Sequence, residues 1–160
     1  MIEYKEGCLV KAFKRGEVQA IAHQANCFNT MGSGVAKAIR AEWPDVYEAD
    51  CQTVKGDRDK LGTLSWCPVV TDGRRKDGHG PVFNLYGQYN YGYDAKQYTD
   101  LEALESAMGV MARFCRVMNI TKIGLPKLGC GLAGANWDDV AEIIERQLGQ
   151  FEVIVYIKEG

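Results

Sequence analysis

The sequence has few of the features that build a metal site. Its 160 residues include six cysteines but no CxxC pair, and the two histidines, His23 and His79, are far apart in the chain. The ligand spacing of structural zinc sites is therefore absent. We expect no metal and no cofactor, and we expect most cysteines to act as small buried hydrophobic residues in a reducing compartment.

Long apolar segments and an excess of positive charge are absent as well. No apolar run approaches the roughly 20 residues of a membrane span, and residues 1–13 lack the apolar core of a signal peptide. The net charge of −2 and the pI near 5.7 argue against a general nucleic-acid or membrane-surface binder. We therefore expect a cytoplasmic monomer that contacts neither membrane nor nucleic acid.

The chain length suits a single domain over residues 1–160, and 46% hydrophobic residues supply a core. Expected strands alternate with expected helices, which favours a three-layer α/β/α sandwich with a mainly parallel, mixed central sheet. Asp100 and Asn136 stand where the N-caps of the last two helices are expected. The expected strands cover 18–22, 61–70, 81–86, 121–126 and 151–157, and the expected helices cover 34–43, 46–54, 101–118 and 137–148.

Two glycine-rich loops each follow an expected strand and open an expected helix. They are NCFNTMGSGVA, from Asn26, and LPKLGCGLAGANW, from Leu125. In α/β sheets, ligands bind beyond the carboxyl ends of strands. Glycine lets the backbone approach a ligand closely, and the N–H groups at a helix N-terminus attract anions. The two loops together predict a ligand with two phosphates, or with one phosphate and a polar sugar.

The common phosphate-binding motifs fit these loops poorly. Gly129, Gly131 and Gly134 spell GxGxxG, but a single helix and a single strand follow, whereas a dinucleotide-binding fold needs a longer series. The pattern GxxxxGK[ST] does not occur. Glycine-rich turns that only connect strands to helices are the remaining alternative, which is weakened by the presence of two such loops with His23 and Asn26 beside the first.

The segments HQANCFNTMGSGVAKAI and GLPKLGCGLAGANWDDV resemble the macrodomain family of ADP-ribose-binding modules, over nearly the whole chain. The segment VFNLYGQYNYG, from Val82, is most similar to the branch that resembles yeast ADP-ribose-1″-phosphate phosphatase, which also favours a histidine at His23. The resemblance implies a pyrophosphate between the loops that satisfies the N–H groups of both helices. It also implies an adenine against apolar side chains such as Leu9 and Val10, and ADP-ribosylated protein as a further partner.

We expect catalysis to depend on His23 and Asn26. Asn26 matches the family asparagine that holds the distal ribose, and His23 can orient a water or protonate the leaving oxygen at neutral pH. The alternatives are a histidine that is only hydrogen-bonded at a strand end and an asparagine that only forms a turn. The expected ligand-binding residues are Leu9, Ala22, Met31, Gly32, Ser33, Gly34, Val35, Tyr86, Gln88, Pro126, Lys127, Leu128, Gly129, Cys130, Gly131, Leu132 and Ala133.

Three positions depart from the family pattern. Cys8 stands where many macrodomains have an aspartate that accepts a hydrogen bond from adenine, so adenine is recognised less specifically or through the backbone. Hydrolases that remove ADP-ribose from glutamate or thymidine carry a lysine in the segment of Gln88, and the nearest lysine here is Lys96. The glutamate-directed hydrolases also have an aspartate where this chain has Ala133. These differences weaken the interpretation as a lysine-dependent hydrolase.

Other polar side chains near the loops have structural alternatives. Cys27 and Cys130 flank the expected phosphate sites, and a thiol at a helix N-terminus can act as a nucleophile, but neither lies in a CxxxxxR arrangement. Asp138 and Asp139 are more often acids of a first helical turn. Lys127 either offsets phosphate charge or stays solvated.

Tyrosines are frequent between Tyr86 and Tyr98, and we expect one or two of them to cover the distal ribose while the rest pack on the surface. The segment DGRRKDGHG is expected to form a solvated hairpin tip.

Three functions remain open. The first is a phosphatase that converts ADP-ribose-1″-phosphate to ADP-ribose and phosphate. The second is a reader that binds ADP-ribose without turnover. The third is an ADP-ribosyl hydrolase that works without the lysine. Glycine loops that bind phosphates equally in the ground state and the transition state give affinity but no rate, so their presence does not distinguish a phosphatase from a reader.

Overall fold

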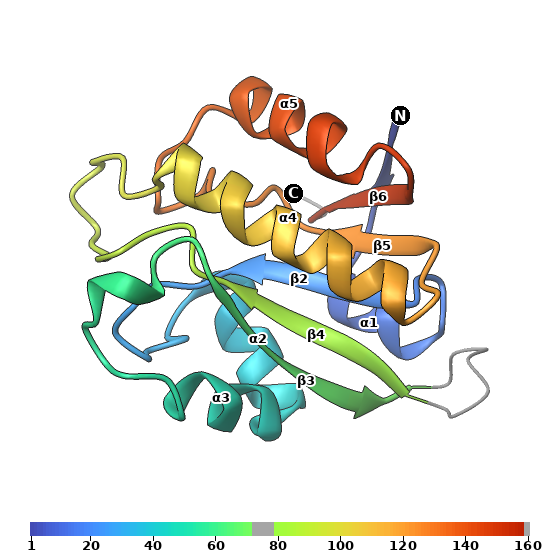
Figure 1. Cartoon of the computed structure of the whole chain (residues 1–160), viewed down its shortest axis with the longest axis horizontal. Coiled ribbons are helices and arrows are strands. Elements are labelled where there is room, and N and C mark those ends of the chain that lie inside the picture. Colours follow the sequence, from blue (N-terminus) through green and yellow to red (C-terminus); the bar gives the residue numbers. More distant parts are fainter. Residues whose placement is uncertain (72–78, 159–160) are drawn as a thin grey trace.

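The computed structural model describes residues 1–71 and 79–158. Six strands form one sheet in the order β1-β6-β5-β2-β4-β3, and helices cover both of its faces (Figure 1). No helix in these two stretches has the length and apolar content needed to span a membrane. The elements are β1 (Ile2–Glu6), α1 (Leu9–Lys14), β2 (Ala20–Gln24), α2 (Gly34–Glu42), α3 (Pro44–Cys51), the 3-10 helix η1 (Arg58–Lys60), β3 (Leu64–Val70), β4 (His79–Leu85), α4 (Leu101–Val117), β5 (Lys122–Leu125), α5 (Trp137–Leu148) and β6 (Glu152–Ile157).

The sheet is parallel except for the antiparallel hairpin of β3 and β4. This arrangement confirms the expected α/β/α sandwich with a mixed, mainly parallel sheet. Neighbouring parallel strands bring their carboxyl ends to the same edge of a sheet, and β2 pairs with β5. The loops that follow these two strands therefore lie side by side, although they are far apart in the sequence.

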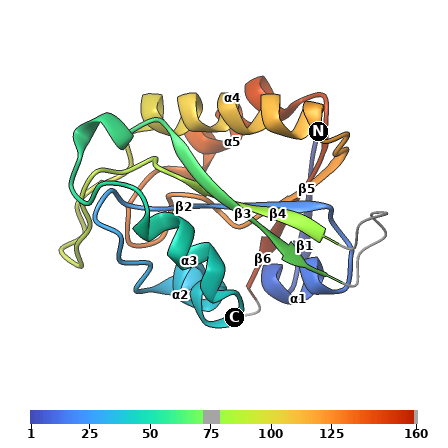
Figure 2. The same ribbon diagram turned by 60° about the horizontal axis from the view of Figure 1, so that its bottom comes forward.

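The two faces of the sheet bury different side chains. Ala20 and Ala22 of β2 pack with α4 and α5, whereas Ile21 packs with α1, α2 and α3. Figure 2 shows α4 and α5 on one side of the sheet and α1, α2 and α3 on the other. Because side chains alternate along a strand, His23 lies on the same face as Ile21, between the sheet and the α2–α3 layer.

The expected helices and strands occur within a few residues of their predicted bounds. Asp100 and Asn136 accept hydrogen bonds from the N–H groups of Ala103 and Asp138, which confirms both as N-caps. The strand β2 extends further than predicted, so His23 lies within the strand instead of after it.

The sequence did not predict β1, α1 or η1. The strand β1 is an edge strand that pairs with β6, and four of its five residues are exposed, so it lacks the apolar alternation of a half-buried strand. Residues 72–78, most of the expected hairpin tip, lie outside the described residues.

Candidate functional site

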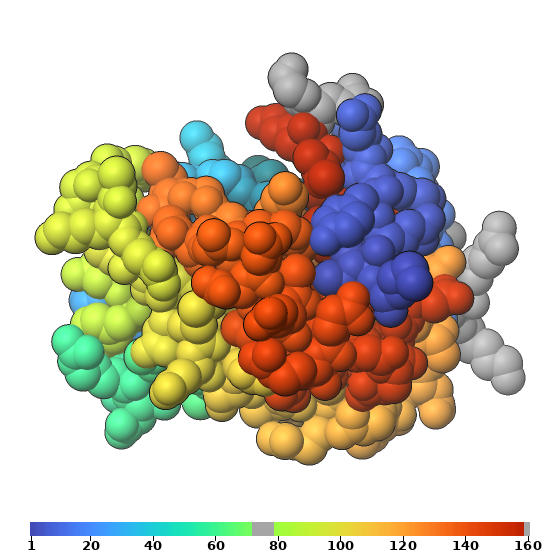
Figure 3. All heavy atoms as spheres, turned by 90° about the horizontal axis from the view of Figure 1, so that it is seen from above, coloured from blue at the N-terminus to red at the C-terminus, as the bar shows by residue number. Residues whose placement is uncertain are grey.

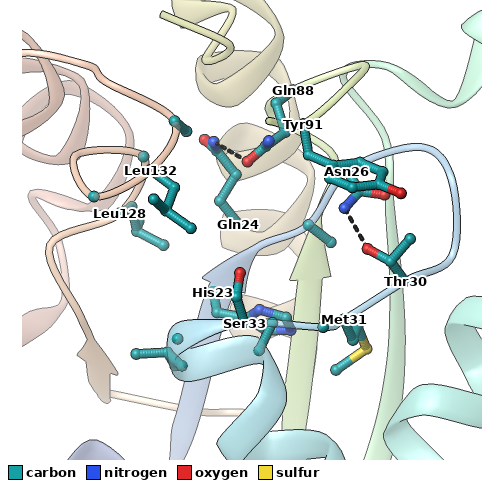
Figure 4. Close-up of a pocket in the computed structure, with 18 of the residues that line it drawn as sticks. His23, Gln24, Asn26, Thr30, Met31, Ser33, Gln88, Tyr91, Leu128 and Leu132 are labelled. Atoms are coloured by element: carbon teal, nitrogen blue, oxygen red, sulfur yellow. Dashed lines mark hydrogen bonds between the residues drawn. The ribbon is translucent and has the colours of Figure 1, made fainter. Parts of the chain in front are cut away.

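A cavity of about 380 Å³ opens at the carboxyl ends of β2 and β5. It lies between the loop after β2 (residues 25–33, the first loop) and the loop after β5 (residues 126–136, the second loop), and residues 88–93 form a further side (Figure 4). This is the edge of the sheet at which the sequence predicted a ligand. The lining residues are His23, Gln24, Ala25, Asn26, Thr30, Met31, Gly32, Ser33, Gly34, Val35, Ala36, Asp50, Gln88, Tyr91, Gly92, Tyr93, Pro126, Lys127, Leu128, Gly129, Gly131, Leu132 and Ala133.

His23 belongs to the floor of this cavity and is 2% exposed. Its Nε2 lies 2.6 Å from Asn84 Oδ1. Asn84 donates its own amide hydrogens to the carbonyl of Val46 and the hydroxyl of Ser65, at 3.3 and 3.0 Å. Asn84 Oδ1 therefore acts as the acceptor, so Nε2 of His23 carries the proton and Nδ1 presents a lone pair.

Burial decides the chemistry available to His23. Desolvation of the imidazolium lowers the pKa of His23 from 6.5 to about 4. The ring is therefore neutral at physiological pH. Of the two roles expected for His23, a neutral ring suits the orientation of a water better than the protonation of a leaving oxygen, and its part in catalysis stays a prediction.

Asn26 forms the turn of the first loop and lines the cavity at the same time. Its amide donates to the hydroxyl of Thr30 at 2.7 Å, and its Oδ1 accepts from the N–H of Phe28 at 2.8 Å (Figure 4). The hydrogen bond to a backbone N–H two residues on is typical of an asparagine turn. Asn26 therefore does form a turn, but whether it also contacts the distal ribose stays a prediction.

A buried lysine supports the first loop from behind. Lys60 donates to Asn29 Oδ1 at 2.6 Å and to the carbonyl of Cys27 at 3.1 Å. Asn29 and Met31 have positive φ angles of 58° and 41°, which asparagine tolerates better than methionine. The loop thus depends on side-chain hydrogen bonds to keep an unfavourable backbone conformation.

The helix α2 begins on the wall of the cavity without a side-chain cap. Ser33 is its N-cap residue but makes no capping hydrogen bond through its hydroxyl, and residues 33–36 all line the cavity. The N–H groups of a first helical turn have no partner within the helix, and the helix dipole adds positive potential there. The start of α2 is therefore suited to bind an anion.

The second loop depends on glycines that approach neighbouring backbone and side chains closely. A Cβ atom on Gly129 would lie 2.8 Å from Thr99 Oγ1, and one on Gly134 would lie 2.9 Å from the carbonyl oxygen of Lys96. Both glycines have positive φ, of 72° and 76°. A Cβ atom on Gly131, in contrast, would meet no atom within 4 Å.

The two helices that follow the loops are not equivalent. Asn136 caps α5 through its hydrogen bond with the N–H of Asp138, and α5 contributes no residue to the lining of the cavity. The capped start of α5 therefore gives no support to a pyrophosphate that contacts the starts of both helices, and the position of the ligand stays a prediction. The start of α2 and the loop backbone before α5 are the two anion-binding candidates.

Three acceptor atoms of the cavity lining are buried without a hydrogen-bond partner. They are His23 Nδ1, Gln24 Oε1 and Asp50 Oδ2. In the described part of the chain, no other buried side-chain N or O atom lacks a partner. An unsatisfied buried polar group costs about 1–3 kcal/mol. Gln24 Oε1 packs closely against Gly87 and Gly129, whereas His23 and Asp50 each bring an unpaired buried acceptor to the lining of the cavity, which suits a ligand that donates hydrogen bonds, such as a sugar with free hydroxyls.

Sequence reasoning missed Asp50. This residue of α3 is 1% exposed, and the hydroxyl of Tyr86 donates to its Oδ1 at 2.6 Å. Burial raises the pKa of the Asp50 carboxyl. A signal existed, because Val46 and Asp50 are four residues apart and form the buried side of α3, so the carboxylate stands on an apolar stripe.

Four of the expected ligand-binding residues do not line the cavity. Leu9 begins α1 and packs with Val10 in the core between α1 and the sheet, so neither lines this cavity, and an adenine against them stays a prediction. Ala22 faces α4 and α5. Tyr86 is buried, with its hydroxyl directed to α3, and Cys130 packs against the core on the α4–α5 side.

The structure does not favour a cysteine nucleophile. Burial raises the pKa of the Cys27 and Cys130 thiols, whereas a nucleophile needs a lowered pKa. Asp138 and Asp139 lie in the first turn of α5, as the structural alternative predicted. Lys127 does line the cavity, and its Nζ lies 5.7 Å from the ring of Trp137.

Tyr91 and Tyr93 form the outer rim of the cavity and are 46% and 73% exposed. The segment that carries them lies against the second loop, where the N–H groups of Tyr98 and Thr99 donate to the carbonyl of Ala133. Figure 3 shows the yellow-green segment beside the orange second loop. A role of the two tyrosines in covering a ligand stays a prediction.

Comparison with known families gives one match that covers most of the chain. The family described as Macro domain matches residues 22–144. An uncharacterized 17.5 kDa protein of Enterobacteria phage T4 is 32% identical over 97% of this chain and 95% of its own length. A DNA ADP-ribosyl glycohydrolase of Mycobacterium tuberculosis is 24% identical, but the chain spans 43% of that protein. The ADP-ribose glycohydrolase OARD1 of Homo sapiens is 23% identical over 90% of this chain and 82% of its own length.

Solved structures show the same fold. A protein of unknown function from Bacteroides thetaiotaomicron superposes with a TM-score of 0.78 at 24% identity and covers 98% of both chains. The macrodomain of Mycobacterium tuberculosis DarG gives a TM-score of 0.71 at 23% identity, with 98% of this chain and 97% of that chain covered. Thermosipho africanus DarTG, solved in complex with ADP-ribose, gives 0.72 at 20% identity over 98% of this chain and 41% of its own.

Proposed function

Because the chain belongs to the macrodomain family, we propose that it binds ADP-ribose and hydrolyses a bond at C1″ of the distal ribose. One observation carries the proposal. The cavity joins an uncapped helix start and a glycine loop to a floor with His23 and Asp50, each of which has an unpaired buried acceptor. The first two features suit a diphosphate, and the third suits the hydroxyls of a ribose.

The start of α2 and the second loop are the groups that we expect to hold the diphosphate. Backbone N–H groups of Gly34 and Val35 would donate to one phosphate, and those of Gly131 and Leu132 to the other. Lys127 lines the same wall and adds a positive charge. Asn26 and His23 then lie toward the distal ribose.

The preferred substrate is ADP-ribose-1″-phosphate, with ADP-ribose and phosphate as products. A neutral His23 cannot supply a proton to the leaving group. Phosphate is a stable anion near neutral pH, since its second pKa is about 6, so it departs without an acid. The lack of an acidic proton donor on the floor therefore suits a phosphate better than a poor leaving group.

Release of ADP-ribose from a modified macromolecule is the second candidate. Tyr93 and Leu132 are 73% and 51% exposed on the rim, which gives a large attached group room outside the cavity. Relatives that cover the chain are named glycohydrolases of this kind. Among the described residues, one lysine lines the cavity, and it is Lys127 of the second loop. The segment of Gln88 contributes no lysine to the lining.

A phosphorus NMR time course tests the proposal. ADP-ribose-1″-phosphate, ADP-ribosylated thymidine oligonucleotide and ADP-ribosylated protein are each incubated with a small amount of protein. We expect the phosphate signal to grow beyond one equivalent of protein with the first substrate. ADP-ribose released from either macromolecule would favour the second candidate. Shifted pyrophosphate signals without any product would show a reader, and unchanged signals would contradict the proposal entirely.

A further inference from the structure

We propose that Asp50 is the general base that activates the attacking water, an inference that rests on the proposed function. Among the described residues, Asp50 supplies the one carboxylate that lines the cavity. It is 1% exposed, and its Oδ2 has no hydrogen-bond partner. The side chain comes from α3, which is neither of the glycine loops nor the segment of Gln88.

A continuous chain of hydrogen bonds holds this carboxylate in place. The chain begins beneath the cavity floor at His23, whose Nε2 lies 2.6 Å from Asn84 Oδ1. Asn84 Nδ2 then lies 3.0 Å from Ser65 Oγ, and Ser65 Oγ lies 2.8 Å from the hydroxyl oxygen of Tyr86. The Tyr86 hydroxyl ends the chain at Asp50 Oδ1, at 2.6 Å. Both end residues, His23 and Asp50, line the cavity, and the three between them do not.

Every donor in this chain points toward Asp50. The Tyr86 hydroxyl gives its hydrogen to Asp50, so it accepts from Ser65, which in turn accepts from Asn84. Hydrogen bonds aligned in one direction polarise one another. The alignment stabilises negative charge on Asp50, and the chain ends in two buried acceptors without a partner, His23 Nδ1 and Asp50 Oδ2, on residues that line the cavity. Asp50 Oδ2 is the acceptor that we assign to the attacking water.

The charge of this floor selects the atom that the water attacks. A carboxylate repels the negatively charged oxygens of a phosphoryl group, which disfavours attack on phosphorus. It stabilises the positive charge that develops on a ribose ring when the bond at C1″ breaks. The floor therefore favours attack on carbon.

The step is written for ADP-ribose-1″-phosphate. The water oxygen forms a bond to C1″, and a water proton moves to Asp50 Oδ2. The bond between C1″ and the bridging oxygen breaks, and its electron pair leaves with the phosphate. The products are ADP-ribose, whose C1″ hydroxyl comes from water, and inorganic phosphate that keeps its four original oxygens. Asp50 then returns the proton to solvent.

Oxygen labelling of the wild-type reaction tests this step without any variant. In H₂¹⁸O, attack on C1″ leaves the released phosphate unlabelled, whereas attack on phosphorus adds one ¹⁸O and shifts the phosphorus NMR signal. We expect unlabelled phosphate. Labelled phosphate would overturn the proposal, because it would place the attack on the atom that the carboxylate disfavours.

The variant Asp50→Asn tests the residue, since an asparagine Oδ1 still accepts from Tyr86. We expect turnover to fall by about 100-fold to 10,000-fold, as for loss of a general base, with the calorimetric Kd for ADP-ribose within a few-fold of wild type. The control is Glu48→Gln, which removes an exposed carboxylate of the same helix and should leave turnover unchanged. Turnover of Asp50→Asn within threefold of wild type would overturn the proposal.

The pH profile separates catalysis from structure. Asp50 must be ionised, so turnover falls as pH drops through its pKa. The Tyr86 hydroxyl lowers the pKa of Asp50, so Tyr86→Phe should shift the acid limb to higher pH. The other titratable groups around Asp50 are Lys60, Cys27 and Tyr47, which keep their protons in the acid range, and His23 at the far end of the chain. An unshifted limb would count against Asp50.

The outcomes also separate this inference from the proposed function. If wild-type protein binds no ADP-ribose, the proposed function itself is wrong. If it binds ADP-ribose but hydrolyses none of the three substrates, only the binding part of the proposed function stands, and the hydrolysis and the Asp50 inference are both wrong.

Discussion

Side-chain hydrogen bonds stabilise the conformation of the first loop, whereas glycines determine the conformation of the second loop. In the first loop, Asn26 and Lys60 supply hydrogen bonds that hold a backbone with two non-glycine residues at positive φ. In the second loop, Gly129 and Gly134 occupy positions where a Cβ atom would lie under 3.0 Å from Thr99 or Lys96. Both loops end at the same cavity, and both follow a parallel strand of the same sheet.

The difference shows that the conformation of a loop at this sheet edge can be specified in two ways. A side-chain network tolerates changes that keep its donors and acceptors, and it adds polar groups that a ligand can contact. A glycine loop tolerates almost no added atom at its close contacts but leaves its N–H groups free. The following predictions test this contrast, in order of decreasing effect.

Adding one methyl group should distinguish tight from open positions within the second loop. Gly134→Ala combines a left-handed backbone, which costs about 1–2 kcal/mol, with overpacking against the Lys96 carbonyl, which costs about 1–3 kcal/mol. We expect a loss of about 3–4 kcal/mol in the free energy of unfolding, measured by urea denaturation, together with weaker ADP-ribose binding. Gly131→Ala is the control and should change stability by less than about 0.5 kcal/mol. Equal losses in the two variants would contradict the role of close contacts.

Acid should destabilise the floor beneath the first loop through His23. Its pKa is about 4 in the fold against 6.5 when unfolded, so the unfolded chain takes up a proton first as pH falls. The stability contributed by neutral His23 is complete above pH 6.5 and is lost progressively down to pH 4. At 1.36 kcal/mol per pKa unit the loss is about 3 kcal/mol. We expect His23→Gln to show a shallower loss in urea denaturation between pH 7 and 4, and identical slopes would argue against a buried neutral ring.

Lys60→Met should loosen the first loop while keeping the apolar stem of the side chain. The change removes donors to Asn29 Oδ1 and to the Cys27 carbonyl, each worth about 1.5–3 kcal/mol to a charged group. Relief from burying an ammonium group offsets part of this, so we expect a net loss of about 2 kcal/mol in unfolding free energy. Lys55→Met, an exposed position before the same 3-10 helix, is the control. A Lys60→Met protein as stable as wild type would show that the first loop keeps its conformation without the hydrogen bonds of Lys60, so that the contrast between the two loops is wrong.

The smallest effect concerns the hydrogen bond between Asn26 and Thr30. Thr30→Val removes the hydroxyl acceptor but keeps the shape, and we expect a loss of about 1 kcal/mol in stability. ADP-ribose binding should weaken as well, because Asn26 is no longer fixed at the cavity wall. Thr30→Ser keeps the hydroxyl and should restore both values. Failure of serine to restore them would mean that the methyl group, not the hydrogen bond, matters at this position.

The sequence predicted the fold well because its signals are local. The caps at Asp100 and Asn136 and the amphipathic runs behind them define α4 and α5 without reference to the rest of the chain. The strand β1 was missed because an exposed edge strand carries no such pattern. Its pairing with β6 is a contact between the two ends of the sequence, which no local pattern encodes.

For the site, the sequence located most of the cavity wall but not its floor. The glycine loops were predicted from their composition, and both line the cavity. Leu9 and Ala22 were assigned to the ligand although the structure packs them in the two cores. Asp50 was overlooked, because a carboxylate on a helix becomes a cavity residue only when that helix packs over the sheet.

The sequence by itself determined the order of the strands and α-helices from β2 to β6, the positions of the two glycine loops and the identity of the groups near them. These properties follow from residue type and spacing along the chain. Only the tertiary structure decided that His23 is neutral, that α2 but not α5 presents its start to the cavity, and that Asp50 and His23 are joined by hydrogen bonds. Protonation and hydrogen bonding depend on which groups exclude water from one another, and that is settled when distant segments pack together.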